Sequence, residues 1–471
     1  MRRLFALALC LFTYTANSQT KIATIFGDHM VLQRNTDVQI WGTDKPNTKI
    51  ILEGSWGEES HAKTDSKGNW KTTLKTIEAG GPYVLSIKGS KNIELQDILL
   101  GEVWLCGGQS NMAMTLDGGP GQHIEDSNNM ILNSTNSNLR FVTIKKAVSD
   151  VPLTSTEGNW EKSAPNTAVN FSAVAYSFGL RLQNFLNVPV GLISSNVGGT
   201  PAQAWTPKET IMAKFPEFKK ELKSDKYSTQ TATGLYNAMI HPLIPFTIKG
   251  AIWYQGEGNA KSTEMAKQYS ELFPAMIESW RANWKQKDFP FYFVQLASMQ
   301  KKNGESWVQL QQAQLKTMLK VPNTGMTVTN DIGYKNRIHP PKKKEVGQRL
   351  ALWALVKNYG VKGILHSGPI YKSIKIKGNK ATLLFNEAPN GITSMGKPLT
   401  DFEIAGADGV YHPAEARIPH KGASLQVWSD KVPKPKNVRY GWKSYIEGCL
   451  FNTAGLPASS FSTETWDEIF K

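Results

Sequence analysis

Between residues 98 and 358 the chain alternates short apolar runs with longer segments of helical periodicity, and this alternation strongly constrains the fold. The apolar runs include ILLGEVWLCGG, VPVGLISSNVGG, IKGAIWYQGEGN and GMTVTND, and the helical segments include AVAYSFGLRLQNFL and KKKEVGQRLALWALVKNYG. Short strands that alternate with helices favour βαβ units and a parallel sheet with helices on both faces. We therefore predict an α/β fold with a parallel sheet for this part of the chain.

Two regions of β character flank this segment. Residues 19–97 contain MVLQRNTDVQIWG, TKIILEGSW and GPYVLSIKG, in which apolar and polar residues alternate between turn-forming residues. Residues 359–471 contain SIKIKGNKATLLF and SLQVWSD. A length of 471 residues agrees with two or three domains. We expect an N-terminal sandwich at 19–97, a central domain at 98–358 and a C-terminal β-rich region.

The first 18 residues have the pattern of a cleavable secretory signal. Arg2 and Arg3 precede an apolar run, and small residues follow it up to Ser18. The apolar run is shorter than the roughly 20 residues that a membrane-spanning helix needs. We therefore expect a secreted or periplasmic protein with no stable membrane insertion.

Composition and spacing exclude several classes of function. The net charge is +15, but apart from the run Lys342–Lys344 the positive charge is spread along the chain. It forms no basic stripe with a reading element, so we expect no nucleic-acid partner. Outside the signal the cysteines are Cys106 and Cys449, which we expect to be buried thiols. Since no HxH, HExxH, P-loop or dinucleotide spacing occurs, we predict neither a metal nor a cofactor.

Three loops follow predicted strands and combine glycine with amide side chains. They are Gly107–Met112, Asn196–Thr200 and Trp253–Asn259. Glycine lets backbone N–H groups approach a ligand, and ligands bind beyond the carboxyl ends of parallel strands. A serine among such donors is typical of acyl transfer, in which a nucleophile lies beside an oxyanion hole. Ser110 also has the position of a helix N-cap, so the prediction rests on the three loops together.

His339 is the candidate base for a serine nucleophile. It lies between the apolar run GMTVTND and a strongly periodic helix, and the following proline restrains its backbone. The competitor is His241 in NAMIHPLIPF, where the apolar setting favours a structural role. Trp205 and Trp253 are consistent with stacking on a sugar ring and equally with packing in the core.

The order of four blocks resembles that of the sialate O-acetylesterase family, in the SGNH/GDSL hydrolase superfamily. The blocks are GEVWLCGGQSNM, VGLISSNVGGTPAQAW, IKGAIWYQGEGN and IHPPKKKEVGQRLALWAL, and the later VRYGW and LFNTAGLPASSF are also similar to the family. The resemblance runs from about Ile25 to the last twenty residues. It implies an SGNH-type three-layer α/β/α esterase domain with β-rich flanking regions.

The resemblance also implies a catalytic serine and histidine. Ser110 would attack the ester carbonyl and His339 would take its proton. In the superfamily the acid that orients the histidine often lies three residues before it, but this chain has Asn336 there. We assign Asp331, the nearest upstream carboxylate, while Glu257 or a backbone carbonyl remains an alternative.

Donors for the oxyanion and residues for the substrate come from the same loops. The implied oxyanion hole consists of the Ser110 N–H, the N–H of Gly199 or Gly198, and the side-chain amide of Asn259 or Gln255. The residues that we assign to substrate binding are Gln109, Gln255 and Glu257.

The sequence leaves the substrate open. O-acetylated sialic acid has a carboxylate that suits a basic protein, whereas related enzymes deacetylate xylan or pectic glycans. The missing acid at Asn336 also permits a function of another class, a catalytically decayed carbohydrate-binding protein. Nothing in the sequence indicates the oligomeric state.

Overall fold

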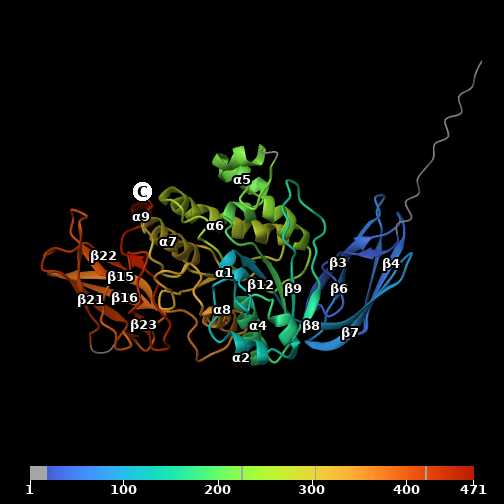
Figure 1. Ribbon diagram of the computed structural model, residues 1–471, viewed down its shortest axis with the longest axis horizontal. Helices are drawn as coiled ribbons and strands as arrows, with labels where there is room; N and C mark the ends of the chain where they lie inside the picture. The colour runs from blue at the N-terminus through green and yellow to red at the C-terminus, as the bar shows by residue number, and fades with distance from the viewer. Residues whose placement is uncertain (1–18, 224–225, 303, 420–421, 471) are drawn as a thin grey trace, which may run out of the picture.

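The three predicted regions follow one another along the long axis of the molecule. The computed structural model describes residues 19–223, 226–302, 304–419 and 422–470, so the predicted signal lies outside the described residues. The N-terminal strands (blue) occupy one end, the helices and strands of the middle follow, and the C-terminal strands (orange to red) occupy the other end (Figure 1). This arrangement confirms the predicted α/β fold with β-rich flanking regions.

The N-terminal region is built from two small layers of strands. One sheet has the order β1–β3–β6, and β2, β4, β5 and β7 join the long strand β8 directly or through one another. Alternate residues of β3 and β4 are buried, among them Ile40 and Leu52, as the alternation of apolar and polar residues predicts. The bounds are β1 (Lys21–Ile22), β2 (Val31–Gln33), β3 (Asp37–Thr43), β4 (Lys49–Gly54), β5 (Glu58–Lys63), β6 (Asn69–Lys75) and β7 (Gly80–Lys88).

Strand β8 (Ile93–Gly108) belongs to both the N-terminal and the central region. Its first half pairs with β7 and β2, and its second half pairs with the two central strands on either side of it. The change of pattern expected at residue 98 therefore falls inside one continuous strand. This strand carries the chain from the sandwich directly to the start of the predicted nucleophile loop.

The central sheet has the order β10–β9–β11–β8–β12–β13–β14. Adjacent strands in this sheet run parallel to each other, except for the antiparallel edge pair β10–β9. The chain builds β9 and β11 on one side of β8 and then β12, β13 and β14 on the other side. Ligands bind in such sheets where the strand order reverses, which here is the carboxyl end of β8. The bounds are β9 (Asn136–Thr143), β10 (Trp160–Ser163), β11 (Val190–Asn196), β12 (Gly250–Tyr254), β13 (Phe291–Val294) and β14 (Thr324–Thr327).

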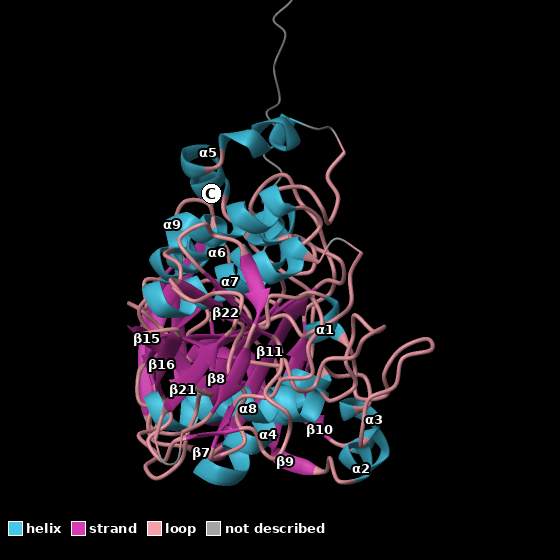
Figure 2. Ribbon diagram, turned by 90° about the vertical axis from the view of Figure 1, so that its left-hand side faces the viewer, coloured by secondary structure: helices cyan, strands magenta, loops and turns pink. Residues whose placement is uncertain are grey.

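Two pairs of helices cover the two faces of this sheet. Helices α4 (Ala173–Leu186) and α8 (Lys343–Lys357) lie on one face, and α6 (Thr263–Trp284) and α7 (Glu305–Lys320) lie on the other (Figure 2). Strand β13 contributes to both interfaces, since Phe291 and Phe293 join one hydrophobic cluster and Tyr292 and Val294 join the other. The predicted three-layer α/β/α arrangement is therefore present.

Further strands and short helices complete the molecule. The C-terminal segment returns to the central domain, because Gln295 donates to the Ser459 hydroxyl (2.7 Å) and Gln312 donates to the Ser460 carbonyl (3.0 Å). Within the described ranges, no helix has the length and apolar character needed to span a membrane. The remaining strands are β15 (Ile370–Lys377), β16 (Lys380–Asn386), β17 (Ile392–Thr393), β18 (Phe402–Ala405), β19 (Tyr411–Pro413), β20 (Glu415–Arg417), β21 (Ser424–Trp428), β22 (Asn437–Tyr440), β23 (Phe451–Asn452) and β24 (Phe461–Ser462). The remaining α-helices are α1 (Ser110–Ala113), α2 (Ser127–Leu132), α3 (Pro165–Ala168), α5 (Lys208–Lys214) and α9 (Trp466–Ile469).

Candidate active site

Ser110 stands where β8 ends and the short helix α1 begins. Gly108 has a φ of 141°, and a Cβ on it would lie 2.2 Å from the Tyr254 carbonyl oxygen, so the close approach of β8 and β12 requires glycine here. The N-cap of α1 is Gln109, and Ser110 is the first helical residue. The capping alternative for Ser110 therefore does not describe its position. Its hydroxyl is instead engaged with a histidine.

His339 lies within hydrogen-bond distance of the nucleophile. Its Nε2 is 2.7 Å from the Ser110 Oγ. Burial, together with the nearby positive charge of Lys343, lowers the pKa of His339 to about 4. The imidazole is therefore neutral at neutral pH and able to accept the proton of the serine, which is the geometry that a general base requires.

The other ring nitrogen of His339 contacts Gln122. The distance from Nδ1 to the Gln122 Oε1 is 2.5 Å. Since a side-chain amide oxygen only accepts, Nδ1 carries the proton and Nε2 is left free to accept from Ser110. Gln122 lies in the loop between α1 and α2, where it exchanges two backbone hydrogen bonds with Gly119. Gln122 was not predicted from the sequence, because the only local signal is the glycine-rich stretch before it.

The predicted contact between Asp331 and His339 does not form. Both carboxylate oxygens of Asp331 accept hydrogen bonds from Arg349 of α8, at 2.8 and 2.6 Å. Arg349 also donates to the Val328 carbonyl. Asp331 therefore links α8 to the segment after β14. The amide of Gln122, and not a carboxylate, contacts the Nδ1 of His339.

The two side-chain amides predicted for the oxyanion hole differ in how many of their N–H groups already donate within the protein. The Gln255 Nε2 donates both hydrogens within the protein, to the Thr200 carbonyl (3.1 Å) and to the Asn259 Oδ1 (2.9 Å). The Asn259 Nδ2 donates one hydrogen to the Gln203 Oε1 (3.1 Å) and retains another. Of the two alternatives, Asn259 is the one with a donor to spare.

The glycine loop after β11 lies against the nucleophile. A Cβ on Gly198 would be 3.5 Å from the Ser110 Cβ, so this residue packs directly on the serine side chain. Gly199 has a φ of 74°, and its carbonyl accepts from Gln230 at 2.9 Å. Within the described part of the chain, the N–H groups of Ser110, Gly198 and Gly199 have no hydrogen-bond partner. These three groups are free to donate to an oxyanion.

The residues predicted to bind substrate are buried and support the loops instead. The Gln109 Oε1 accepts from the Gly258 N–H at 3.1 Å, which ties the first loop to the third. Gln255 is fully buried and also accepts from the Tyr269 hydroxyl at 3.1 Å. Glu257 is 8% exposed and accepts from Asn111. These side chains form hydrogen bonds within the protein, and their role is to hold the three loops together.

A buried ionic network lies beneath the catalytic pair. Asn111 accepts from the Lys343 Nζ and donates to Glu257 and to the Ile338 carbonyl (3.0 Å). Asn111 follows Ser110 and Ile338 precedes His339, so this side chain joins the nucleophile loop to the base loop. Lys343 is 1% exposed, and its Nζ lies 5.5 Å from the centre of the Tyr254 ring.

Burial shifts both charged members of this network toward neutrality. It lowers the pKa of Lys343 to about 7, which Glu257 partly opposes, and it raises the pKa of Glu257. In the sequence, Lys343 is the middle residue of the run Lys342–Lys344. Nothing in that run distinguishes the one buried lysine from its neighbours.

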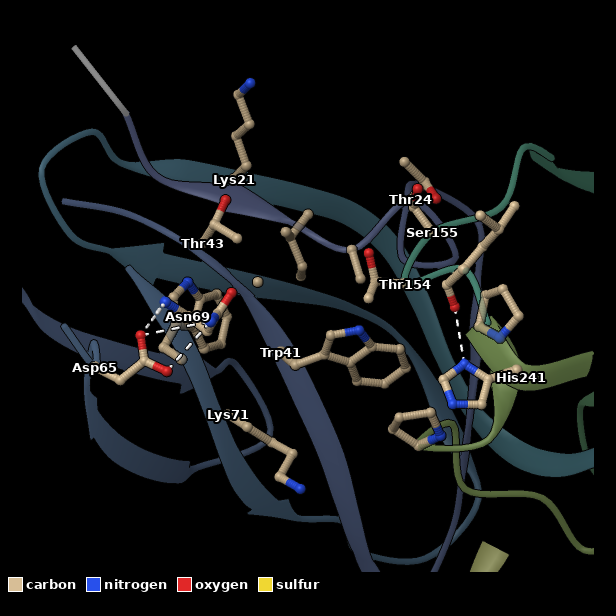
Figure 3. Close-up of a pocket in the computed structure, with 17 residues that line it drawn as sticks. Lys21, Thr24, Trp41, Thr43, Asp65, Asn69, Lys71, Thr154, Ser155 and His241 are labelled. Carbon is tan, nitrogen blue, oxygen red and sulfur yellow. Dashed lines mark hydrogen bonds between the residues drawn. The ribbon is translucent and has the colours of Figure 1, made fainter. Parts of the chain in front are cut away.

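The competing histidine has a structural position. The His241 Nδ1 lies 2.9 Å from the Leu153 carbonyl oxygen, in a cavity of about 600 Å³ that Trp41 and other residues of the N-terminal sandwich line (Figure 3). Trp205 and Trp253 are at most 1% exposed and pack edge to face against each other, so they belong to the core and are not free to stack on a sugar.

The described residues contain no group of three or more histidine, cysteine or acidic side chains arranged to hold a metal. Cys106 and Cys449 are free and buried, as expected.

Comparisons with known proteins identify the family of this chain. Residues 100–355 match the family model described as carbohydrate esterase, sialic acid-specific acetylesterase. The chain is 32% identical over 427 residues to the sialate O-acetylesterase of Mus musculus, covering 77% of this chain and 78% of that one. It is 30% identical over 402 residues to that of Homo sapiens, covering 77% and 76%.

A solved structure matches nearly the whole chain. The crystal structure of a carbohydrate acetylesterase from Xanthomonas citri has a TM-score of 0.87 and 37% identity, over 95% of this chain and 100% of that one. The four blocks noted in the sequence lie within the part of the chain that the family model matches. The chain therefore belongs to the sialic acid-specific acetylesterase family of carbohydrate esterases.

Proposed function

We propose that this protein removes O-acetyl groups from sialic acid through an acetyl-serine intermediate on Ser110. The observation that carries the proposal is the 2.7 Å approach of the Ser110 hydroxyl to the His339 Nε2, at the strand end where an α/β sheet binds ligands. The family and the relatives support acetylated carbohydrate as the substrate class. The names of the mammalian relatives support sialic acid within that class.

The first half of the reaction forms the intermediate. Ser110 attacks the acetyl carbonyl carbon while His339 takes the hydroxyl proton on Nε2. The negative charge that develops on the carbonyl oxygen is stabilised by the N–H groups of Ser110 and Gly198 or Gly199, with the spare N–H of Asn259. Such donors contribute about 3–4 kcal/mol each in a serine hydrolase of another fold. The imidazolium then returns its proton to the sugar oxygen, and the deacetylated sugar leaves.

The second half regenerates the enzyme. His339 takes a proton from water, the resulting hydroxide attacks the acetyl group, and acetate leaves as the Ser110 oxygen regains its proton. Throughout the cycle, the amide oxygen of Gln122 keeps the ring of His339 in one orientation. No metal or cofactor enters this scheme.

The test measures acetate release from two acetylated substrates, one a sialic acid and the other a polysaccharide. Wild type and Ser110→Ala are each given O-acetylated sialic acid and acetylated xylan. We expect wild type to release acetate from the sialic acid and the variant to release none. Release from xylan alone would refute the substrate assignment while keeping the mechanism, and full activity of Ser110→Ala would refute the mechanism.

We also propose that the protein is exported and loses residues 1–18. The support is the sequence pattern of Arg2 and Arg3 followed by an apolar run and small residues. Intact mass of the protein from its native host would show a mature chain that begins near Gln19, and a chain that keeps its first residues would contradict the proposal.

A further inference from the structure

We propose that Arg337 forms a carboxylate-binding subsite beside the catalytic pair, through which the enzyme recognises the negative charge of its sugar substrate. This inference rests on the proposed function, since it assigns a recognition residue to the same site.

Arg337 is held next to the catalytic histidine by two adjacent loops. It lies two residues before His339, at the end of a turn in which its N–H donates to the Tyr334 carbonyl (3.3 Å). Its Nη1 is 3.2 Å from the His123 Nδ1, and the neighbouring Gln122 contacts the His339 Nδ1. The guanidinium therefore lies on the loop pair that positions the base, at the exposed edge of the site.

The guanidinium has donors to spare. Arginine carries five N–H donors, and the contact with His123 uses one of them. Among the described residues Arg337 forms no ion pair, and its side chain is exposed. Other arginines of the chain are committed to carboxylates: Arg34 to Glu102, Arg140 to Asp97, Arg349 to Asp331 and Arg439 to Glu464. The arginine beside the active site is thus left open for a carboxylate from elsewhere.

The surroundings of Arg337 are positively charged. Lys335 lies on the same turn, and its carbonyl accepts from the Gln300 N–H (2.9 Å), which brings the segment with Lys301 alongside. Neither lysine forms an ion pair among the described residues. On the opposite loop Asp126 is already paired with Lys344 at 2.6 Å. Glu125 of that loop is exposed, and its N–H donates to the Pro341 carbonyl at 3.0 Å.

The chemistry of sialic acid fits such an edge. A sialic acid carries its carboxylate and its acetylated hydroxyls on the same monosaccharide, so an ester placed at Ser110 brings a carboxylate into the same site. Guanidinium binds carboxylate through two parallel hydrogen bonds, which fix orientation as well as charge. Xylan has no carboxylate on its acetylated xylose units, so the guanidinium of Arg337 would have no carboxylate to bind on that substrate.

The experiment compares substrates that differ only in this charge. Wild type and Arg337→Gln are assayed for kcat/KM on a 9-O-acetylated sialoside with a free carboxylate and on the methyl ester of the same sialoside. We expect wild type to prefer the free acid, and the substitution to reduce the ratio of the two kcat/KM values about tenfold or more, because a charged hydrogen-bonded pair is lost. Arg337→Lys retains the charge without the paired donors and is expected to fall between the two.

Arg181→Gln is the matched control. It removes the same charge from an exposed position on α4, and the ratio should stay at the wild-type value. An unchanged ratio in Arg337→Gln would overturn the inference while leaving the proposed function intact, even if both kcat/KM values fell. Failure of wild type to deacetylate either sialoside, with acetylated xylan cleaved instead, would overturn the proposed function and the inference with it.

Discussion

His339 keeps a proton on Nδ1 because the Gln122 amide oxygen accepts it at 2.5 Å. A carboxylate at that position would stabilise the imidazolium that forms during catalysis, whereas an amide oxygen orients the ring with much less charge stabilisation. At the residue scale the site therefore combines good orientation with a weakly basic imidazole. The low pKa of His339, caused by burial and then by Lys343, agrees with this combination.

Substitution of Gln122 tests its role as the orienting group. Gln122→Ala removes the acceptor, and we expect kcat to fall about tenfold or more, since part of the contribution of the base is lost. Gln122→Glu restores an acceptor with a negative charge, which raises the pKa of His339 and moves the acid limb of the pH profile upward. A Gln122→Ala variant with wild-type kcat at every pH would show that another group orients the histidine.

The pH dependence should follow His339. The base must be neutral, so kcat/KM on a neutral acetyl ester is expected to rise as the pH passes through about 4 and to stay level toward neutrality. Lys343→Met removes a positive charge that lowers the pKa of His339, so the acid limb should move to higher pH.

A double variant separates this effect from misfolding. Lys343→Met leaves Glu257 buried without the nearby positive charge of Lys343, and a buried charge that is not compensated destabilises the folded protein. Lys343→Met with Glu257→Gln removes both charges, and we expect it to fold better while showing the same upward displacement of the acid limb. An acid limb at the wild-type position in a folded double variant would contradict the electrostatic role of Lys343.

At the element scale, helix α8 connects the catalytic histidine to the core. It begins four residues after His339 and packs on α4 at Gly347, where a Cβ would lie 2.4 Å from the Val174 carbonyl oxygen. Because that obstacle is backbone, it does not move aside easily. The position of the base loop thus depends on a close contact between two helices.

Gly347→Ala should therefore destabilise the protein. The overpacking cost of about 1–3 kcal/mol exceeds the gain of about 1 kcal/mol that alanine normally brings to a helix interior. The measurement is the midpoint of urea unfolding, with Gln348→Ala on the same helix as a control that should stay close to wild type. A higher midpoint for Gly347→Ala would show that α4 and α8 are packed less tightly than described.

The sequence predicts the elements better than the partners of particular side chains. The periodicity of residues 173–186 and 342–360 predicts α4 and α8, because burial of one helix face requires a repeated apolar pattern. The partners of Gln122 and Asp331 could not be predicted in this way. Which acceptor reaches His339 depends on how a loop of glycines crosses the site, and the pairing of Asp331 with Arg349 depends on the docking of α8. Neither leaves a periodic trace in the sequence.

At the scale of the whole molecule, the three regions share elements rather than only adjoining one another. Strand β8 passes from the sandwich into the central sheet, and the C-terminal segment supplies the acceptors for Gln295 and Gln312. Buried amides that lose their partners are costly, at about 1–3 kcal/mol for each unsatisfied group. We propose that residues 98–358 form the esterase domain but depend on both neighbours for stability.

Expression of residues 98–358 alone tests this dependence. The shortened chain lacks the first five residues of β8 and the acceptors from Ser459 and Ser460, so we expect no cooperative thermal unfolding. Residues 19–471 should unfold cooperatively under the same conditions. A shortened chain that melts cooperatively and retains Ser110-dependent esterase activity would show that the central domain folds independently of the flanking regions.

Covalent labelling of Ser110 tests the central claim most directly. The protein is treated with a fluorophosphonate, which reacts with activated serines, and the modified peptide is identified by mass spectrometry while residual acetylesterase activity is measured. We predict one adduct on Ser110, loss of activity in proportion to labelling, and far slower labelling in His339→Ala. Full acetylesterase activity in protein that is completely labelled at Ser110, or an adduct on another serine that accounts for the loss, would contradict the account.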